Sequence, residues 1–82
     1  MRIQVLVRLK PGVLDVQGKA VEHSLKVLGF DDVSGVRIGK LIELDVEGAD
    51  FQSAKERVEL LCGKLLVNGI IENFEIKNGD QS

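Results

Sequence analysis

The chain contains few of the residues that enzymes use for nucleophilic, redox or metal chemistry. Its 82 residues include one cysteine, one histidine and one proline, and there is no tryptophan or tyrosine. One cysteine cannot form an internal disulfide or the paired-cysteine loop of a metal chaperone. His23 and Ser24 are neighbours in a helical pattern and point to different sides, so they do not make a nucleophile and base pair. The sequence therefore predicts no catalytic, metal or cofactor site on this chain.

Long apolar runs and aromatic clusters are also missing. No run approaches the ~20 apolar residues that span a bilayer, and Met1 leads directly into a strand pattern rather than into a leader. The three aromatic residues are all phenylalanines, and the first strand offers none on which a nucleic-acid base would stack. Residues 1–40 carry seven basic and four acidic side chains, whereas residues 41–82 carry four and nine, without a basic cluster. We expect a cytoplasmic chain that binds neither membranes nor nucleic acids.

The first third of the chain predicts a strand, a tight turn and a helix. Residues 3–9 largely alternate between apolar and polar, which is typical of a half-buried strand. Pro11 and Gly12 suit the central positions of a type II turn, because proline fixes φ and glycine tolerates a positive φ. Asp15 is a candidate N-cap, and the helical spacing of apolar residues then continues to Gly29.

A β-hairpin is predicted in the middle of the chain. Residues 36–38 and 42–46 both have strand character. A two-residue loop between them would place an arginine opposite an isoleucine on the core face. Pairing Ile38 with Ile42 instead keeps apolar residues opposite each other, so we expect a three-residue loop or bulge at 39–41.

A second helix and a last strand complete the pattern. Asp50 or Ser53 is the expected N-cap of a helix that ends near Asn68. Its apolar residues form one stripe: Ala54, Val58, Leu61, Cys62 and Leu65. A strand over residues 70–76 follows, and residues 78–82 are expected to form a polar, frayed tail.

The element order βαββαβ predicts an α+β fold for a single domain over residues 1–82. Right-handed crossovers convert this order into a ferredoxin-like sandwich, a four-stranded antiparallel sheet with two helices on one face. The other sheet face is then uncovered, and on it Leu6 and Leu41 are either solvated or part of a subunit interface. A core of this size supplies only about 3–5 kcal/mol of stability, which favours self-association.

The glycine near the start of the first helix has two interpretations. A glycine at a helix N-terminus can help to hold an anion, as in an acylphosphatase-like hydrolase. Such a site needs an arginine in the same helical turn to clamp the phosphoryl group, and no arginine follows Gly18 before Arg37. The simpler interpretation is that Gly18 is a packing or close-approach glycine near a helix start.

Two blocks carry a family resemblance: LKPGVLD at residues 9–15 and QGKAV at residues 17–21. They resemble PurS, the small subunit of bacterial and archaeal phosphoribosylformylglycinamidine synthase. The resemblance covers nearly the whole chain, because shorter blocks follow at 28–30, 36–40, 42–44, 62–68 and 71–72. Val16 and Gly69 stand where this family often has proline, and both positions still suit a helix start or a turn.

The resemblance implies a non-catalytic subunit in purine biosynthesis that forms homodimers or larger assemblies. It would join a glutaminase subunit to a large synthetase subunit, which together convert formylglycinamide ribonucleotide to formylglycinamidine ribonucleotide with glutamine nitrogen and ATP. ATP and Mg²⁺ are expected on the synthetase subunit, with no cofactor on this chain. Partner contacts are expected in one loop and one turn, at Lys10, Pro11, Gly12, Asp15, Gln17, Gly18, Lys19, Arg37, Gly39 and Lys40. The alternative is a regulatory module of this architecture that binds a small molecule at a dimer interface.

Overall fold

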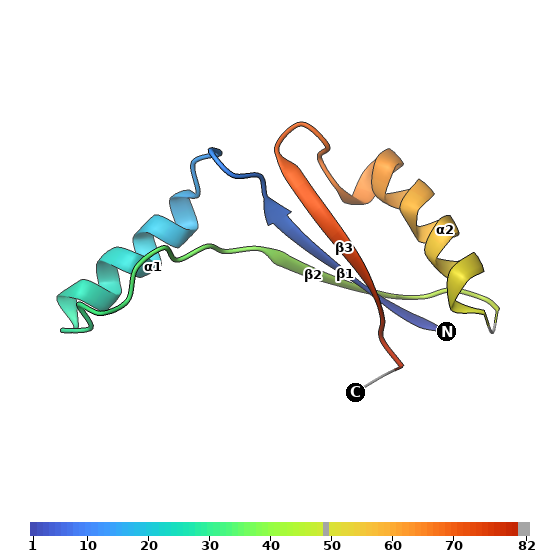
Figure 1. Ribbon diagram of the computed structural model, residues 1–82, viewed down its shortest axis with the longest axis horizontal. Helices are drawn as coiled ribbons and strands as arrows, with labels where there is room; N and C mark the ends of the chain where they lie inside the picture. Colours follow the sequence, from blue (N-terminus) through green and yellow to red (C-terminus); the bar gives the residue numbers. More distant parts are fainter. Residues whose placement is uncertain (49, 81–82) are drawn as a thin grey trace.

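The centre of the molecule is an antiparallel sheet. The computed structural model describes residues 1–48 and 50–80, and within them the sheet has three strands (Figure 1): β1 (Arg2–Leu9), β2 (Lys40–Asp45) and β3 (Glu72–Asn78). Strand β1 lies between the other two. Val5 is opposite both Ile42 and Ile76, so this register places apolar residues of all three strands on one face.

The core lies between this apolar face and the second helical segment. That segment consists of helix α2 (Phe51–Leu61) and the π-helical turn η1 (Cys62–Leu66). Five side chains of the core are at most 1% exposed: Ile3, Val5, Val7, Val58 and Cys62. The alternation of β1 and the burial of Cys62 were therefore predicted correctly from the sequence.

Part of the predicted helical stripe is exposed. Ala54, Val58 and Cys62 pack into the core, whereas Leu61 is 38% and Leu65 83% exposed. The wider π-helical turn begins at Cys62 and rotates the residues that follow out of phase with the 3.6-residue stripe. Leu65, which was predicted on the same stripe as Val58 and Cys62, therefore does not share their burial.

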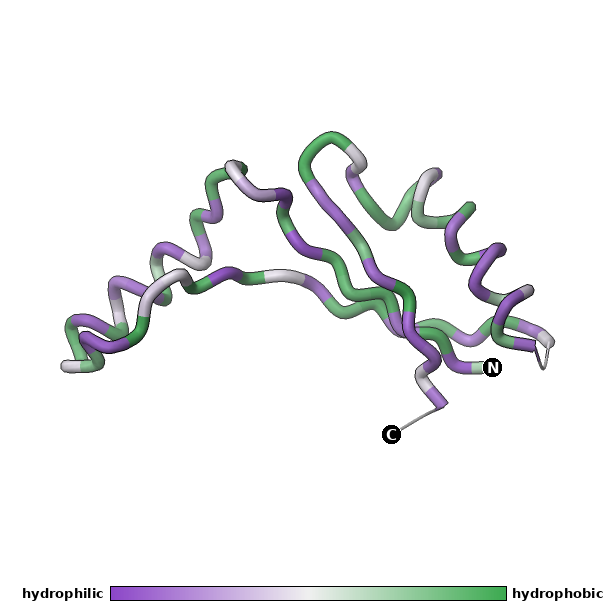
Figure 2. Tube along the Cα trace, viewed as in Figure 1, coloured by the Kyte–Doolittle hydropathy of each residue, from purple (hydrophilic) through white to green (hydrophobic). Residues whose placement is uncertain are grey.

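Helix α1 (Val16–Val27) projects away from the sheet instead of covering it (Figure 1). We call α1 and the segment that returns from it to β2, residues 16–38, the arm. Figure 2 shows that apolar residues continue along the arm, and Val21 on α1 is 41% exposed. The Cα radius of gyration is 15.9 Å, whereas a compact domain of this length has about 12 Å. The arm thus carries apolar side chains away from the core.

The predicted hairpin and four-stranded sheet are not present in the single chain, as far as residues 1–48 and 50–80 describe it. Residues 36–38 do not fold back onto β2 but lead into it along the same direction (Figure 1). The amides of Val36 and Ile38 donate instead to the carboxylates of Glu22 in α1 and of Asp15, the N-cap of α1. The sequence prediction of two helices on one sheet face was therefore wrong for one chain, because the arm binds the strand that would have formed the hairpin.

The helix caps follow the local sequence closely. Asp15 caps α1, and Gly29 has a φ of 95° just after its end, so both predicted boundaries are confirmed. Asp50, rather than Ser53, caps α2, because its carboxylate accepts from the amides of Gln52 and Ser53. None of the helices in the described part of the chain is long and apolar enough to cross a membrane.

The C-terminal strand lies two residues further along the chain than predicted. It begins at Glu72 rather than at residue 70 and continues to Asn78. The amide of Gly79 still donates to the carbonyl oxygen of Arg2 at 2.9 Å, so pairing with β1 extends into the segment that was expected to fray. Residues 81 and 82 of that predicted tail lie outside the described residues.

Candidate functional site

The turn after β1 has the predicted geometry. The amide of Val13 donates to the carbonyl oxygen of Lys10 at 3.1 Å, which closes a four-residue turn, and Gly12 has a φ of 88°. Pro11 and Gly12, the two central residues, are exposed. They are free to contact another molecule, and the turn fixes their position at the tip of the loop.

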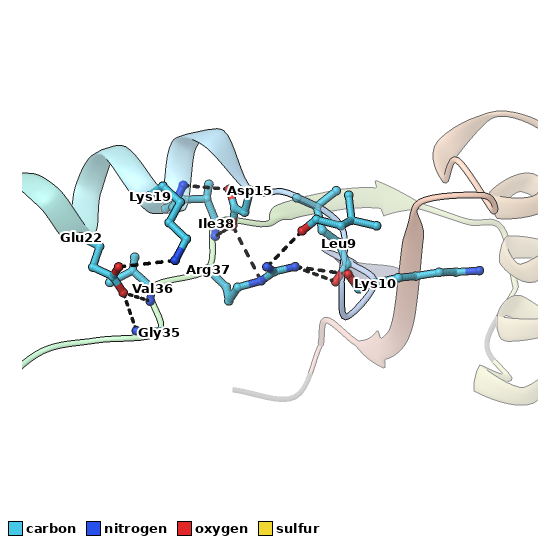
Figure 3. A network of polar contacts seen from close by, with 11 residues as sticks. Leu9, Lys10, Asp15, Lys19, Glu22, Gly35, Val36, Arg37 and Ile38 are labelled. Atoms are coloured by element: carbon cyan, nitrogen blue, oxygen red, sulfur yellow. Dashed lines mark hydrogen bonds and ion pairs between the residues drawn. The ribbon is translucent and has the colours of Figure 1, made fainter.

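The Asp15 carboxylate contacts both the start of α1 and the strand that returns from it (Figure 3). It is only 4% exposed, and its Oδ1 accepts from the amide of Gly18 at 2.8 Å, while Oδ2 accepts from the amide of Ile38 at 2.7 Å. The Nε of Arg37 lies 3.9 Å from the same Oδ2. These two amides, followed by the Arg37 charge, hold the pKa of Asp15 below its usual value. Asp15 therefore joins α1 to the strand that enters β2.

Arg37 ties the same strand to the loop after β1. Its guanidinium donates to the carbonyl oxygens of Lys10 and Val13 at 3.3 Å and lies 3.4 Å from that of Leu9 (Figure 3). A guanidinium carries five donors in a planar fork, so one side chain can satisfy several carbonyls at once. Most of its hydrogen-bonding capacity is used within the chain, which makes Arg37 a brace of the loop.

A second brace lies further along the arm. Glu22 Oε1 accepts from the amides of Gly35 at 2.6 Å and Val36 at 3.4 Å, and these bonds lower the pKa of Glu22. Gly18 allows the close approach of this segment, since a Cβ there would lie 2.5 Å from the carbonyl oxygen of Val36. The simpler interpretation of Gly18 as a packing glycine is confirmed. The alternative of an anion-binding loop has no support in this geometry.

The remaining basic candidates differ in their surroundings. Lys10 Nζ donates to the carbonyl oxygen of Gly69 at 2.7 Å, and Lys40 Nζ lies 3.2 Å from Glu72 Oε2. Lys19 is exposed on α1 and lies 3.7 Å from the Glu22 carboxylate. The structure thus brings Lys10, Asp15, Gly18 and Arg37 together around the loop as supporting residues.

The exposed candidates are on the outside of the loop and of α1. Pro11, Gly12, Gln17 and Lys19 all present accessible side chains or backbone there. Gly39 differs, because its backbone packs against β1, where a Cβ would lie 2.5 Å from the Val7 carbonyl oxygen. Arg37 and Lys40 are exposed as well, but their side chains bind the loop and Glu72. Pro11, Gly12, Gln17 and Lys19 are therefore the exposed candidates whose side chains make no polar contact between segments in the described part of the chain.

The described residues contain no group of three or more potential metal ligands. The Cys62 thiol is buried, and this burial, with a smaller effect of Glu59, raises its pKa and disfavours the reactive thiolate. An open groove of about 700 Å³ follows the edge formed by β1 and the start of β2. It is lined mainly by apolar atoms, with three basic side chains at its border: Arg8, Arg37 and Lys40.

Two contacts were not predicted from the sequence. One joins Glu22 to the turn at Gly35, and the other joins the Asp15 carboxylate to the amide of Ile38. The N-cap of Asp15 is a local feature, but its bond to Ile38 joins residues 23 positions apart. Glu22 contacts a turn 13 residues away, and its spacing within α1 gives no sign of this. Both contacts depend on the path of the returning strand, which no local pattern predicts.

Comparison with known proteins gives one consistent family. Residues 2–79 match the family model described as "PurS: Phosphoribosylformylglycinamidine (FGAM) synthase". The chain is 46% identical over 71 residues to phosphoribosylformylglycinamidine synthase subunit PurS of Synechocystis sp., which covers 87% of this chain and 71% of the relative. It is 41% identical over 73 residues to the PurS subunit of Methanocaldococcus jannaschii, which covers 89% and 88%.

Solved structures agree with the sequence relatives. The crystal structure of M. jannaschii PurS, described as one of the subunits of formylglycinamide ribonucleotide amidotransferase in the purine biosynthetic pathway, is similar with a TM-score of 0.84 and 38% identity. The match covers 93% of this chain and 92% of that one. A chain in the structure of PurLQS from Thermotoga maritima is similar with a TM-score of 0.83 and 32% identity, covering 93% of each.

Proposed function

The chain belongs to the PurS family of phosphoribosylformylglycinamidine (FGAM) synthase subunits, and we propose that it couples the glutaminase subunit of this enzyme to the ATP-dependent synthetase subunit. In this role it holds the two partners so that ammonia released from glutamine reaches the synthetase before it escapes to water. The product is formylglycinamidine ribonucleotide, an intermediate of purine biosynthesis. The chain itself contributes no catalytic group, and ATP and Mg²⁺ bind to the synthetase subunit.

The family match over residues 2–79 is the observation that carries this proposal. A similar chain is part of PurLQS from T. maritima, so a protein of this shape occurs in a complex of that name. The chemistry of the chain supports the same role. Its one cysteine is buried with a raised pKa, and the buried carboxylate of Asp15 is occupied by backbone amides.

Four exposed residues are the proposed contacts with the partner enzymes: Pro11, Gly12, Gln17 and Lys19. Lys19 gives the cleanest test, because its side chain is exposed and its one ion pair is at 3.7 Å. Charge reversal by Lys19→Glu should weaken assembly while the chain stays folded. Lys64→Glu, at an exposed position of η1, is the matched control with the same charge change. Equal assembly of both variants would remove Lys19 from the contact surface.

Self-association is part of the proposed function. A single copy has three strands in its described residues and an arm with exposed apolar side chains. Association of copies would supply the fourth strand and the second covering helix of the ferredoxin-like sandwich that the βαββαβ order predicts. We place the assembled complex in the cytoplasm, where the soluble substrates of purine synthesis are made and used.

The deciding experiment measures FGAM formation by the purified glutaminase and synthetase subunits, with and without this chain. Glutamine is the nitrogen donor in one series and ammonia in the other. If the chain couples the two subunits, only the glutamine-driven rate depends on it. If neither rate responds, the coupling role is wrong, and saturable binding of a nucleotide or amino acid to the isolated chain in calorimetry would favour the regulatory module.

A further inference from the structure

The dipeptide Asn-Gly occurs twice in the chain, at residues 68–69 and 78–79. In this dipeptide the backbone nitrogen of the glycine can attack the side-chain amide of the asparagine, because glycine has no Cβ to obstruct the approach. The proposed function uses neither dipeptide. The two differ in how the structure holds the attacking nitrogen.

The first dipeptide lies in the turn that joins η1 to β3 (Figure 1), and both of its residues are exposed. Within residues 1–48 and 50–80, the Gly69 amide donates to no acceptor. A Cβ placed on Gly69 would meet no atom within 4 Å other than those of its chain neighbours, so the surrounding space is open. The nitrogen can therefore approach the Asn68 side chain without breaking a hydrogen bond of the fold.

The Asn68 side chain is already folded along the backbone that follows it. Its Oδ1 accepts from the amide of Ile70 at 3.1 Å, which is the hydrogen bond of an Asx turn. This oxygen becomes negatively charged when the Gly69 nitrogen adds to the side-chain carbonyl carbon. The Ile70 amide then stabilises the charge, as a donor of an oxyanion hole does.

The peptide group between the two residues is also prepared for attack. Its carbonyl oxygen, that of Asn68, accepts from the amides of Ile71 at 3.1 Å and Glu72 at 2.8 Å. When the Gly69 nitrogen loses its proton, much of the negative charge moves to this oxygen. Hydrogen bonds to the charged form favour that form, so the two donors make the nitrogen easier to deprotonate.

The charges around the turn allow the same step. Lys10 Nζ donates to the carbonyl oxygen of Gly69 at 2.7 Å and brings a positive charge next to the reacting peptide group. A carboxylate is also present, because Glu72 Oε1 accepts from the amide of Asn68 at 2.7 Å. Lys40 Nζ lies 3.2 Å from the other oxygen of this carboxylate and offsets its charge.

We propose that Asn68 is a site of intramolecular modification, at which the chain converts its own asparagine into aspartate and isoaspartate. The Gly69 nitrogen forms a bond to Cγ of Asn68, and the proton from this nitrogen leaves with Nδ2 as ammonia. Water then opens the resulting succinimide. Cleavage of the bond from the nitrogen to Cγ gives aspartate, and cleavage of its bond to the backbone carbonyl carbon gives isoaspartate. One water is consumed and one ammonia is released, with no change of oxidation state.

The second dipeptide is an internal comparison with the same side-chain geometry. Asn78 Oδ1 accepts from the amide of Asp80 at 2.9 Å, the same Asx turn as at Asn68. The Gly79 amide, however, donates to the carbonyl oxygen of Arg2 at 2.9 Å and extends the pairing of β3 with β1. Attack at this site requires that the end of the sheet opens first, so the structure protects Asn78.

The modification would change how the turn is held. Isoaspartate adds one methylene group to the backbone between residues 68 and 69, which displaces the Gly69 carbonyl oxygen from Lys10 Nζ. Either product also adds a carboxylate in the turn that contains the carboxylate of Glu72. Because Lys10 directly precedes the loop at Pro11, the modified turn loses a link to the proposed contact loop.

The test incubates the full, folded chain in a mildly alkaline buffer and follows both sites by mass spectrometry. Trypsin cleaves after Lys64 and Lys77 and so places the two sites in separate peptides, residues 65–77 and 78–82. Fragmentation of the first peptide distinguishes Asn68 from Asn73. Acid should form at Asn68 at least about tenfold faster than at Asn78. In guanidinium chloride, where the protecting hydrogen bond is lost, the two rates should be similar.

A matched pair of variants tests the role of the Gly69 nitrogen. Gly69→Pro has no backbone N–H and should stop the reaction at Asn68, and proline is compatible with this position because Gly69 does not have a positive φ. Gly69→Ala keeps the N–H and should only slow the reaction. Asn78 should react at an unchanged rate in both variants. A protein isoaspartyl methyltransferase with a labelled methyl donor should label the incubated parent chain but not Gly69→Pro.

Two outcomes in the folded parent chain would refute the proposal. One is equal or faster reaction at Asn78, and the other is an unreacted Asn68 although both sites react in guanidinium chloride. Neither measurement depends on the folding of a variant. The reaction goes beyond the proposed function and needs no partner enzyme, so its failure would leave the test of the glutamine-dependent rate unaffected.

Discussion

Gly39→Ala tests whether the path of the chain at the base of the arm is fixed by backbone packing. A methyl group at this position would lie 2.5 Å from the carbonyl oxygen of Val7 and 3.7 Å from the Cα of Arg8. Both neighbours are backbone atoms of the central strand, which cannot rotate away. The contact must lengthen by about 1 Å to reach ordinary van der Waals distance, so the chain has to separate from β1 at this point.

The cost follows from the hydrogen bonds at that end of the sheet. Val7 and Lys40 form the last residue pair between β1 and β2, and its two backbone hydrogen bonds contribute about 0.5–1.5 kcal/mol each. The loss of these bonds lowers the free energy of unfolding. The lower conformational entropy of the unfolded alanine variant offsets part of this loss, so the net decrease is about 1–2 kcal/mol. For a domain of this size the midpoint temperature should fall by roughly 5–15 °C.

The assay is urea unfolding followed by circular dichroism at one fixed chain concentration, because self-association makes apparent stability depend on concentration. Gly63→Ala is the matched control, since a Cβ at Gly63 meets no atom within 4 Å. The control should be neutral or slightly stabilising, because alanine is the better helix former. If Gly39→Ala and Gly63→Ala unfold at the same urea concentration, the backbone at residue 39 is not held against β1.

Three further predictions concern the arm and the core. The lowered pKa of Asp15 means that its ionised form stabilises the folded chain. This stabilisation is fully present above about pH 5 and is lost as the pH falls through the lowered pKa, so the urea midpoint should decrease as the pH falls below about 4. Asp15→Asn should show a smaller pH dependence, and the remaining slope comes from the other carboxylates with a lowered pKa, such as Glu22; an equal slope in both proteins would contradict the assignment. Gly18→Ala should speed hydrogen exchange at the Ile38 amide, because a Cβ displaces the strand at Val36; unchanged exchange would contradict this. Cys62 should react with iodoacetamide at least about tenfold more slowly in the folded chain than in the denatured chain, and equal rates would place it outside the core.

Features set by neighbouring residues could be predicted from the sequence. The turn at Pro11 and Gly12 and the N-cap at Asp15 involve partners within three residues along the chain. The burial of one face of β1 follows from a period of two, which a single strand carries by itself. For such features the preferred conformation is determined by interactions within the segment, so the sequence pattern and the structure agree.

The arm could not be predicted in the same way. Pairing of Ile38 with Ile42 was recognised from the sequence, but that pattern does not state whether the two residues belong to one chain or to two. The braces at Glu22 and Arg37 depend on this choice, since they bind the returning strand and the loop only when the strand stays on the arm. Asp15 and Arg37, two of the candidate contact residues, support the loop within the chain, and the contact of this loop with a partner stays a prediction.

The division of the site into supporting and exposed residues also bears on how so small a chain can join two enzymes. Asp15 and Arg37 fix the loop at the junction of the sheet and the arm, so Pro11 and Gly12 are presented in one conformation. In a dimer of two copies this loop appears twice. A twofold assembly presents every surface in two copies on different sides. A rigid, repeated loop of this kind would let one dimer contact two partner enzymes at once. A single 82-residue chain with one small core has less surface for two such contacts.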